Sequence, residues 1–183
     1  MSQVEEGCPE AGFTLIELLV VLLVIGVLLA IAIPTFLSVL GGTNNTAAQA
    51  DLQTALTGSD AYYANASGSF ADLMDPAAAL ASTLTQVDTG LDYVTGTSSS
   101  GPHVVSVYSS PDGQALVLTA WAPQEDDCWG ILDLKARPPA PIFGKSAVGT
   151  YYLVARHLPG SSQCVAGPSI SPSAISSTGF PHS

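Results

Sequence analysis

The chain contains few charged residues and very few basic ones. Only 10% of its 183 residues are charged, and 4 Lys and Arg stand against 15 Asp and Glu, so the formal net charge is -11 at pH 7. A nucleic-acid-binding surface needs clustered basic side chains to pair with phosphates, and so does a site for anionic lipid. The basic residues here are spread through the C-terminal third, at Lys135, Arg137, Lys145 and Arg156. We therefore expect no nucleic-acid partner, and any membrane attachment must be hydrophobic.

Sequence patterns for catalysis and for tight metal binding are also missing. His103, His157 and His182 are isolated from one another, and no phosphate-binding G-x-x-x-x-G-K loop occurs. The cysteines, at positions 8, 128 and 164, do not have the spacing of zinc ligands. We expect a protein that is not an enzyme, with no cofactor and no dedicated metal site.

One acidic run is a weak calcium candidate. Glu125, Asp126 and Asp127 are consecutive, and Asp112 precedes them on another turn. Calcium prefers oxygen ligands, but dedicated calcium loops alternate their ligands along the chain and this run does not. We favour a solvated loop over a metal site.

What the chain has in excess is one apolar run near its N-terminus. Between Phe13 and Leu40 the only charged residue is Glu17. As a helix this run is about 42 Å long at ~1.5 Å per residue, which exceeds the ~30 Å hydrocarbon core of a bilayer. A run of this length with a single charge is uncommon inside soluble domains. It predicts a membrane-spanning helix.

The composition divides the chain into three parts. Residues 1–12 are short, polar and acidic and are expected to be a leader, residues 13–40 form the apolar helix, and residues 41–183 form one globular domain that ends in a Ser/Pro-rich tail. Gly41 and Gly42 mark a weak point in the helix. Helical periodicity then resumes at Ala48 and continues to a turn near Ala66, and a short helix is predicted over 77–84.

Short β-branched and aromatic runs separated by turn residues begin near residue 91. The predicted strands are Leu91–Thr95, His103–Ser109, Gln114–Ala122, Cys128–Leu134 and Thr150–Arg156. The sequence Ser-Pro-Asp-Gly at 110–113 is a strong turn signal and predicts an antiparallel hairpin between the second and third of these strands. Beyond His157 the chain is expected to offer little to pack.

The N-terminal sequence GFTLIELLVVLLVIGVLLAIAIPTFL, from Gly12 to Leu37, combines four features. A glycine precedes an aromatic residue, Phe13; a carboxylate, Glu17, follows four residues later; the apolar run is otherwise uncharged; and a proline, Pro34, lies within it. This combination resembles the N-terminus of type IV pilins and of type II secretion pseudopilins.

The resemblance implies a specific maturation. A prepilin peptidase would cut between Gly12 and Phe13 and methylate the new N-terminus at Phe13. Glu17 would neutralise the N-terminal amine of a neighbouring subunit during assembly. Pro34, which removes one helical hydrogen bond, would form a flexible zone together with Gly41 and Gly42; a tolerated transmembrane kink is an equally good interpretation of this proline.

The resemblance also implies an α+β, pilin-like fold, in which the long N-terminal helix packs on a C-terminal antiparallel sheet. The domain would lie outside the cytoplasm, where a disulfide between Cys128 and Cys164 can form. Before assembly the chain would be a single-pass protein of the cytoplasmic membrane, and after assembly it would lie in a surface filament. Its partners would be the peptidase, other pilin subunits, an assembly ATPase and a membrane platform protein.

Three functions remain open on this basis. The chain is a structural filament subunit, a minor pilin or pseudopilin of a secretion or DNA-uptake machine, or a secreted or single-span binding protein without an assembly role. The third finds support in Ala30-Ile31-Ala32, which matches the small-residue pattern of ordinary signal-peptide cleavage. The leader also lacks the Lys or Arg usual in the family, and one hypothesis is a start codon further upstream.

Overall fold

The computed structural model describes residues 13–71, 84, 90–101 and 103–181, and at 37–41 it describes the backbone alone. The chain divides into two compact units, Met1–Val39 and Leu40–Ser183. The predicted leader at 1–12 and the predicted short helix at 77–84 lie outside the described residues, apart from Leu84, which is buried.

One long helix, α1, runs from Leu15 to Asn65. It ends within a residue of the predicted turn at Ala66. The backbone stays helical through Pro34 and through Gly41 and Gly42. A glycine lowers helix stability by about 1 kcal/mol without forbidding the conformation, so the predicted weak point does not appear as a break. Flexibility of this zone stays a prediction.

The second unit contains a six-stranded sheet in the order β1-β2-β3-β4-β5-β6. The strands are β1 (Asp92–Thr95), β2 (Val104–Ser109), β3 (Ala115–Ala122), β4 (Asp127–Leu134), β5 (Gly149–Ala155) and β6 (Ala174–Ser176). All five predicted strands are present, with ends that differ by at most one residue. The predicted α+β fold, a long apolar N-terminal helix and a C-terminal sheet, is confirmed.

The predicted hairpin between β2 and β3 is antiparallel, with Val107 opposite Leu118. Its turn is closed by Ser110, whose hydroxyl donates to the Asp112 carboxylate and accepts from the Ala115 amide at 2.9 Å. Gly113 has a φ of 67°, and a Cβ there would lie 2.7 Å from the Ala71 amide nitrogen. Glycine is therefore required at this turn.

Two features differ from the sequence prediction. The sheet is mixed, because β1 pairs with β2 in parallel. The chain turns at Gly96, which has a φ of 67°, and then returns through an irregular loop in which Ser98 pairs with Val165. The tail also packs, since its segment β6 adds a strand beside β5. Three-residue strands without a periodic pattern give no sequence signal.

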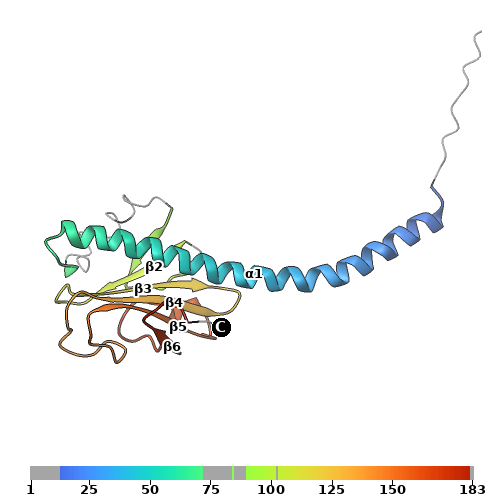
Figure 1. The fold of residues 1–183 in the computed structure, drawn as a ribbon. Coiled ribbons are helices and arrows are strands. Elements are labelled where there is room, and N and C mark those ends of the chain that lie inside the picture. Colours follow the sequence, from blue (N-terminus) through green and yellow to red (C-terminus); the bar gives the residue numbers. More distant parts are fainter. Residues whose placement is uncertain (1–12, 72–83, 85–89, 102, 182–183) are drawn as a thin grey trace, which may run out of the picture. The chain divides into compact units, whose positions relative to one another are not determined.

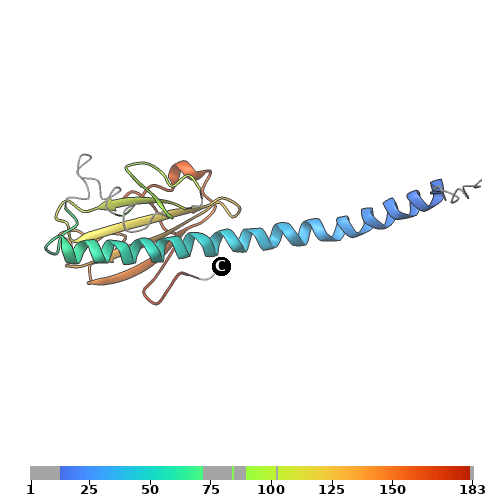
Figure 2. The ribbon, with the colours of Figure 1, turned by 90° about the horizontal axis from the view of Figure 1, so that it is seen from above.

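The sheet is covered on both faces, which explains why β3 and β4 are buried along their whole length. On one face lies the second half of α1, whose Ala48, Leu52 and Ala55 join a core cluster with β2, β3 and β4 (Figures 1 and 2). The other face carries a second apolar cluster that includes Ala166 of the tail and Phe143 of the β4–β5 loop.

Candidate functional site

The described chain begins at the N-terminus of α1, where Thr14 and Glu17 form a reciprocal cap. The backbone N–H and the hydroxyl of Thr14 donate to Glu17 Oε2, at 3.0 and 2.8 Å, and the Glu17 amide donates to Thr14 Oγ1 at 3.3 Å. This capping box satisfies helix N–H groups that have no partner within the helix. Gly12, on the other side of the predicted cleavage bond, lies outside the described residues.

Thr14 is a site residue that the sequence prediction did not single out. The signal was present, since a threonine followed three residues later by a glutamate, just before an apolar run, is the pattern of a capping box. The cap holds the Glu17 side chain beside the first turn of α1, one turn from Phe13. A carboxylate there also interacts favourably with the positive end of the helix.

The helix surface that follows is apolar and unburied. Leu15–Phe36 is one helix long and apolar enough to cross a membrane, and none of it is buried within the protein. Its 22 residues correspond to about 33 Å, close to the ~30 Å hydrocarbon thickness. The large side chains are exposed throughout, from 46% at Ile25 to 89% at Leu15. A surface of this extent requires an apolar environment.

Pro34 lies inside this span and is followed by a threonine that bonds back to the helix backbone. The Thr35 hydroxyl donates to the backbone oxygens of Ala32 at 2.9 Å and of Ile31 at 3.2 Å. Proline removes one helical N–H donor, and a threonine bonded back to the preceding turn bends helices further. The two residues together supply the local means for a kink.

In the second unit, polar contacts fix α1 to the sheet along its length. Trp129 Nε1 donates to Asn45 Oδ1 at 3.0 Å, and the backbone N–H of His103 donates to Asp51 Oδ2 at 3.1 Å. Further along the helix, the Lys135 ammonium lies 2.7 Å from Asp60 Oδ1. These contacts join α1 to β4 and to the residue that precedes β2.

Lys135 holds two carboxylates together. Its Nζ atom lies 2.9 Å from Asp133 Oδ2, whose side chain is only 4% exposed, and 5.4 Å from the centre of the Tyr63 ring. Burial opposes the charge on this lysine, but the hydrogen bonds to Asp60 and Asp133 outweigh it and raise the pKa of Lys135 above its usual range.

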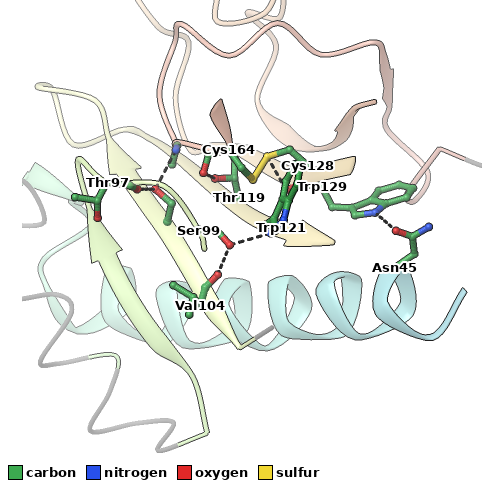
Figure 3. The surroundings of a disulfide bond; sticks show 11 residues. Asn45, Thr97, Ser99, Val104, Thr119, Trp121, Cys128, Trp129 and Cys164 are labelled. Atoms are coloured by element: carbon green, nitrogen blue, oxygen red, sulfur yellow. Dashed lines mark hydrogen bonds between the residues drawn. A yellow bond between two sulfur atoms is a disulfide. The ribbon is translucent and has the colours of Figure 1, made fainter. Parts of the chain in front are cut away.

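A disulfide joins Cys128 of β4 to Cys164, with a Cα–Cα distance of 5.4 Å (Figure 3). Both cysteines are fully buried beside Trp121. The Cys164 carbonyl also accepts the Ser99 amide at 2.9 Å, so the disulfide and this hydrogen bond hold the same stretch of chain. The pair links a central strand to the C-terminal segment.

The acidic residues considered for calcium do not form one site. Asp127 pairs with Arg156 at 3.3 Å, whereas Glu125 and Asp126 are exposed on the turn before it. Asp112 lies at the opposite end of β3, where the hydrogen bond from Ser110 lowers its pKa. Among the residues that the structure describes, no group of three or more His, Cys, Asp or Glu side chains is placed to hold a metal ion.

A groove of about 570 Å³ lies beside Trp129, between α1 and the C-terminal segment. Phe180 forms one wall and packs edge-on against Trp129 at a centroid distance of 5.7 Å. The sequence prediction did not include this groove because the tail was expected to contribute little packing. Its lining offers no cluster of reactive or titratable groups.

A comparison with protein families finds a match in the N-terminal part of the chain. The model for the prokaryotic N-terminal methylation motif matches residues 9–33, a stretch that contains the Thr14–Glu17 cap and most of the apolar span. Neither a search of curated proteins nor a search of solved structures finds a match for the chain. The N-terminal segment, with its exposed apolar helix, therefore carries the signature of type IV pilins and pseudopilins.

Proposed function

We propose that this chain is the precursor of a structural subunit of a type IV pilus-like filament. A prepilin peptidase cuts it between Gly12 and Phe13 and methylates Phe13, and the mature subunit assembles through its apolar helix. The observation that carries the proposal is the methylation motif at 9–33 on a helix whose apolar surface is wholly unburied.

The apolar span has two successive environments in this proposal. Before assembly it lies in the cytoplasmic membrane, with the globular unit outside the cytoplasm. After assembly the same surface packs against the helices of other subunits. Both environments remove the exposed side chains of Leu15–Phe36 from water, which a single soluble copy cannot do. The disulfide supports this placement, since disulfides persist in oxidising compartments.

Glu17 has the geometry for an ionic contact between subunits. Both hydrogen bonds that the cap gives to its carboxylate go to Oε2, so Oε1 can accept another donor. Cleavage creates a charged amine at Phe13, and a carboxylate in an apolar surrounding is stabilised by an opposite charge. In this proposal Glu17 accepts the Phe13 amine of a neighbouring subunit and sets the axial register.

The capping role and the charge role of Glu17 can be separated. Glu17→Gln keeps an N3 side chain that can complete the capping box but removes the charge. Thr14→Ala removes the N-cap, at about 1 kcal/mol, and keeps the carboxylate. We expect both variants to be cut before Phe13, Thr14→Ala to assemble, and Glu17→Gln to yield few filaments. Mass spectrometry of the N-terminus and electron microscopy of sheared filaments measure the two steps. Wild-type filament yield from Glu17→Gln would refute the charge role.

A minor pilin or pseudopilin role uses the same cleavage and the same helix. The amount of the chain in sheared surface material separates the two roles, because a major subunit dominates that material and a minor one does not. In either role the partners are the peptidase, other pilin subunits, an assembly ATPase and a platform protein of the membrane.

A further inference from the structure

Charges of opposite sign are separated along this chain. All Asp and Glu residues lie at or before Asp133, and all Lys and Arg residues lie at or after Lys135. Strand β4 ends at Leu134, between the last acidic residue and the first basic one. The turn that precedes β4, residues 123–126, is acidic, and the loop that follows it, residues 135–148, contains Lys135, Arg137 and Lys145 and no acidic residue.

The two segments lie at opposite ends of the globular unit. Along α1, Asn45 contacts Trp129 and Asp60 contacts Lys135. From Asn45 to Asp60 the helix advances about 22 Å, and from Trp129 to Lys135 the strand advances about 20 Å. Because the two contacts occur in the same order and at nearly the same spacing, α1 and β4 run side by side in the same direction. The acidic turn therefore lies at the end where α1 enters the unit, called here the entry end, and the 135–148 loop leaves β4 at the other, called the far end (Figure 1).

The far end presents two basic side chains without carboxylate partners. Lys135 is paired within the unit, but Arg137 is exposed, and neither Arg137 nor Lys145 forms an ion pair within the described part of the chain. Lys145 lies over the Tyr151 ring, two residues into β5. Val148 is 62% exposed, the one large apolar side chain so exposed among the described residues of the second unit.

The 135–148 loop is held in a defined conformation. The amide of Ile142 donates to the Lys145 oxygen at 3.0 Å, and the amide of Lys145 donates to the Ile142 oxygen at 2.8 Å. Phe143 and Gly144 between them have φ values of 49° and 73°, a tight turn that is unusual for a bulky residue. The partly buried Phe143 packs on the sheet face against both the second apolar cluster and the cluster around the disulfide, so the loop folds back along this face and the turn is anchored there. The basic groups are therefore presented on a fixed support.

The entry end presents the complementary charge. Glu125 and Asp126 are exposed, and their carboxylates form no ion pair within the described residues. Asp127 beside them is buried and already paired with Arg156. At the far end the exposed Asp112 carboxylate accepts hydrogen bonds from its own turn, from Ser110 and from the Gln114 amide.

We infer that the far end of one copy of this chain binds the entry end of a second copy, with Arg137 and Lys145 facing Glu125 and Asp126. A symmetric contact that set Arg137 and Lys145 against the same residues of the second copy, or Glu125 and Asp126 against theirs, would bring like charges together, which is unfavourable. A contact between different patches is heterologous, and where its rotation does not close it produces an open helical filament. The inference rests on the proposed filament function and adds to it the surfaces by which the globular units meet.

The first test uses wild-type filaments built from a mixture of unlabelled and ¹⁵N-labelled subunits. A carbodiimide joins an amine to a carboxylate only where they touch, and mass spectrometry of mixed-label peptides identifies bonds between copies. We expect a bond from Lys145 to Glu125 or Asp126 of another copy. Filaments in which Lys145 is linked to another protein, or to no second copy, would overturn the inference.

The second test exchanges the charges in the full-length chain. Arg137→Glu/Lys145→Glu and, separately, Glu125→Lys/Asp126→Lys should lower filament yield about tenfold, because two attractive contacts become repulsive. Combining all four substitutions restores the attraction and should restore the yield. Normal cleavage before Phe13 and an intact disulfide in each variant show that maturation and folding are unchanged.

The outcomes separate this inference from the proposed function. If wild-type filaments form and the two-residue variants build them equally well, or if the four-residue variant does not recover, the charge contact is wrong and the filament function stands. If the wild-type chain is not cut before Phe13 and builds no filament, the proposed function fails and the inference fails with it.

Discussion

Removing the disulfide should destabilise the globular unit by a large fraction of its stability. Cys128 and Cys164 are 36 residues apart in the sequence, and the bond closes that stretch into a loop. In the chain-entropy treatment a loop of this length contributes about 4 kcal/mol, against a total of ~5–15 kcal/mol for a domain. Hydrogen bonds hold the same segment, including Ser99 N–H to the Cys164 oxygen and Ala166 N–H to Ser106 Oγ. We therefore expect a loss of about 3 kcal/mol and retention of the fold.

The suitable replacement is Cys128→Ala/Cys164→Ala, since both positions are fully buried and a serine hydroxyl there would lack a partner. Urea unfolding of the mature full-length chain, followed by tryptophan fluorescence, measures the effect. Trp121 lies in the same apolar cluster as the disulfide and reports on it directly. With a slope of about 1–3 kcal/mol per molar urea, the midpoint should fall by roughly 1–3 M.

Reductant provides the matched control, because it should lower the midpoint of the wild-type chain and leave that of the double variant unchanged. A wild-type midpoint that does not respond to reductant would refute the energetic argument. Free thiols at both positions in protein taken from the cell surface would contradict both the disulfide and the proposed location outside the cytoplasm.

Three further predictions concern processing and packing. Gly12→Leu should leave a full-length precursor in the membrane, visible by electrophoresis, because the peptidase must reach the following bond; normal processing would count against the assignment. Gly130→Ala should lower the free energy of unfolding by about 1–3 kcal/mol, because the added Cβ would lie 2.9 Å from the Leu118 backbone oxygen. Gly101→Ala is the control and should be nearly neutral in the same urea assay, because a Cβ there would meet nothing within 4 Å. Lys135→Met should cost about 2–4 kcal/mol by unpairing the buried Asp133 carboxylate, less than for a fully buried pair because the lysine is partly exposed. The pKa of Lys135 is raised in the folded protein, so its contribution to the free energy of unfolding is fully present below the ordinary pKa of 10.5 and is lost as the pH rises through the raised pKa of the folded state. The urea midpoint of the wild-type chain should therefore fall at alkaline pH, and that of Lys135→Met should change less.

Much of the fold could be predicted from local sequence. The apolar run and the helical periodicity that resumes at Ala48 predicted the helix. Short β-branched and aromatic runs between turn signals predicted five strands to within one residue. The parallel pairing of β1 with β2 could not be predicted, because it depends on the path of an irregular loop and on a bridge from Ser98 to the distant Val165. Strand direction is a tertiary property that local patterning does not contain.

Part of the candidate site could likewise be predicted from the sequence, and part of it could not. Glu17 stood out because a carboxylate in an apolar run is conspicuous, and its partner Thr14 carried a recognisable capping signal. The packing of the tail was missed, because Phe180 is a single aromatic among Ser, Pro and Gly, and its contacts with Trp129 and Tyr152 arise only when β6 pairs with β5. The separation of acidic from basic residues can be read in the sequence. That the acidic turn and the basic loop lie at opposite ends of the globular unit follows only from the side-by-side course of α1 and β4.

The most direct test of the filament-subunit proposal is the N-terminus of the mature protein. Mass spectrometry and Edman sequencing of the chain recovered from membranes and from sheared surface material should both find Phe13 as the first residue, carrying one methyl group on its α-amine. A mature chain that begins after Ala32, as signal-peptide cleavage would give, would contradict the account, because it would lack Glu17 and most of the apolar helix.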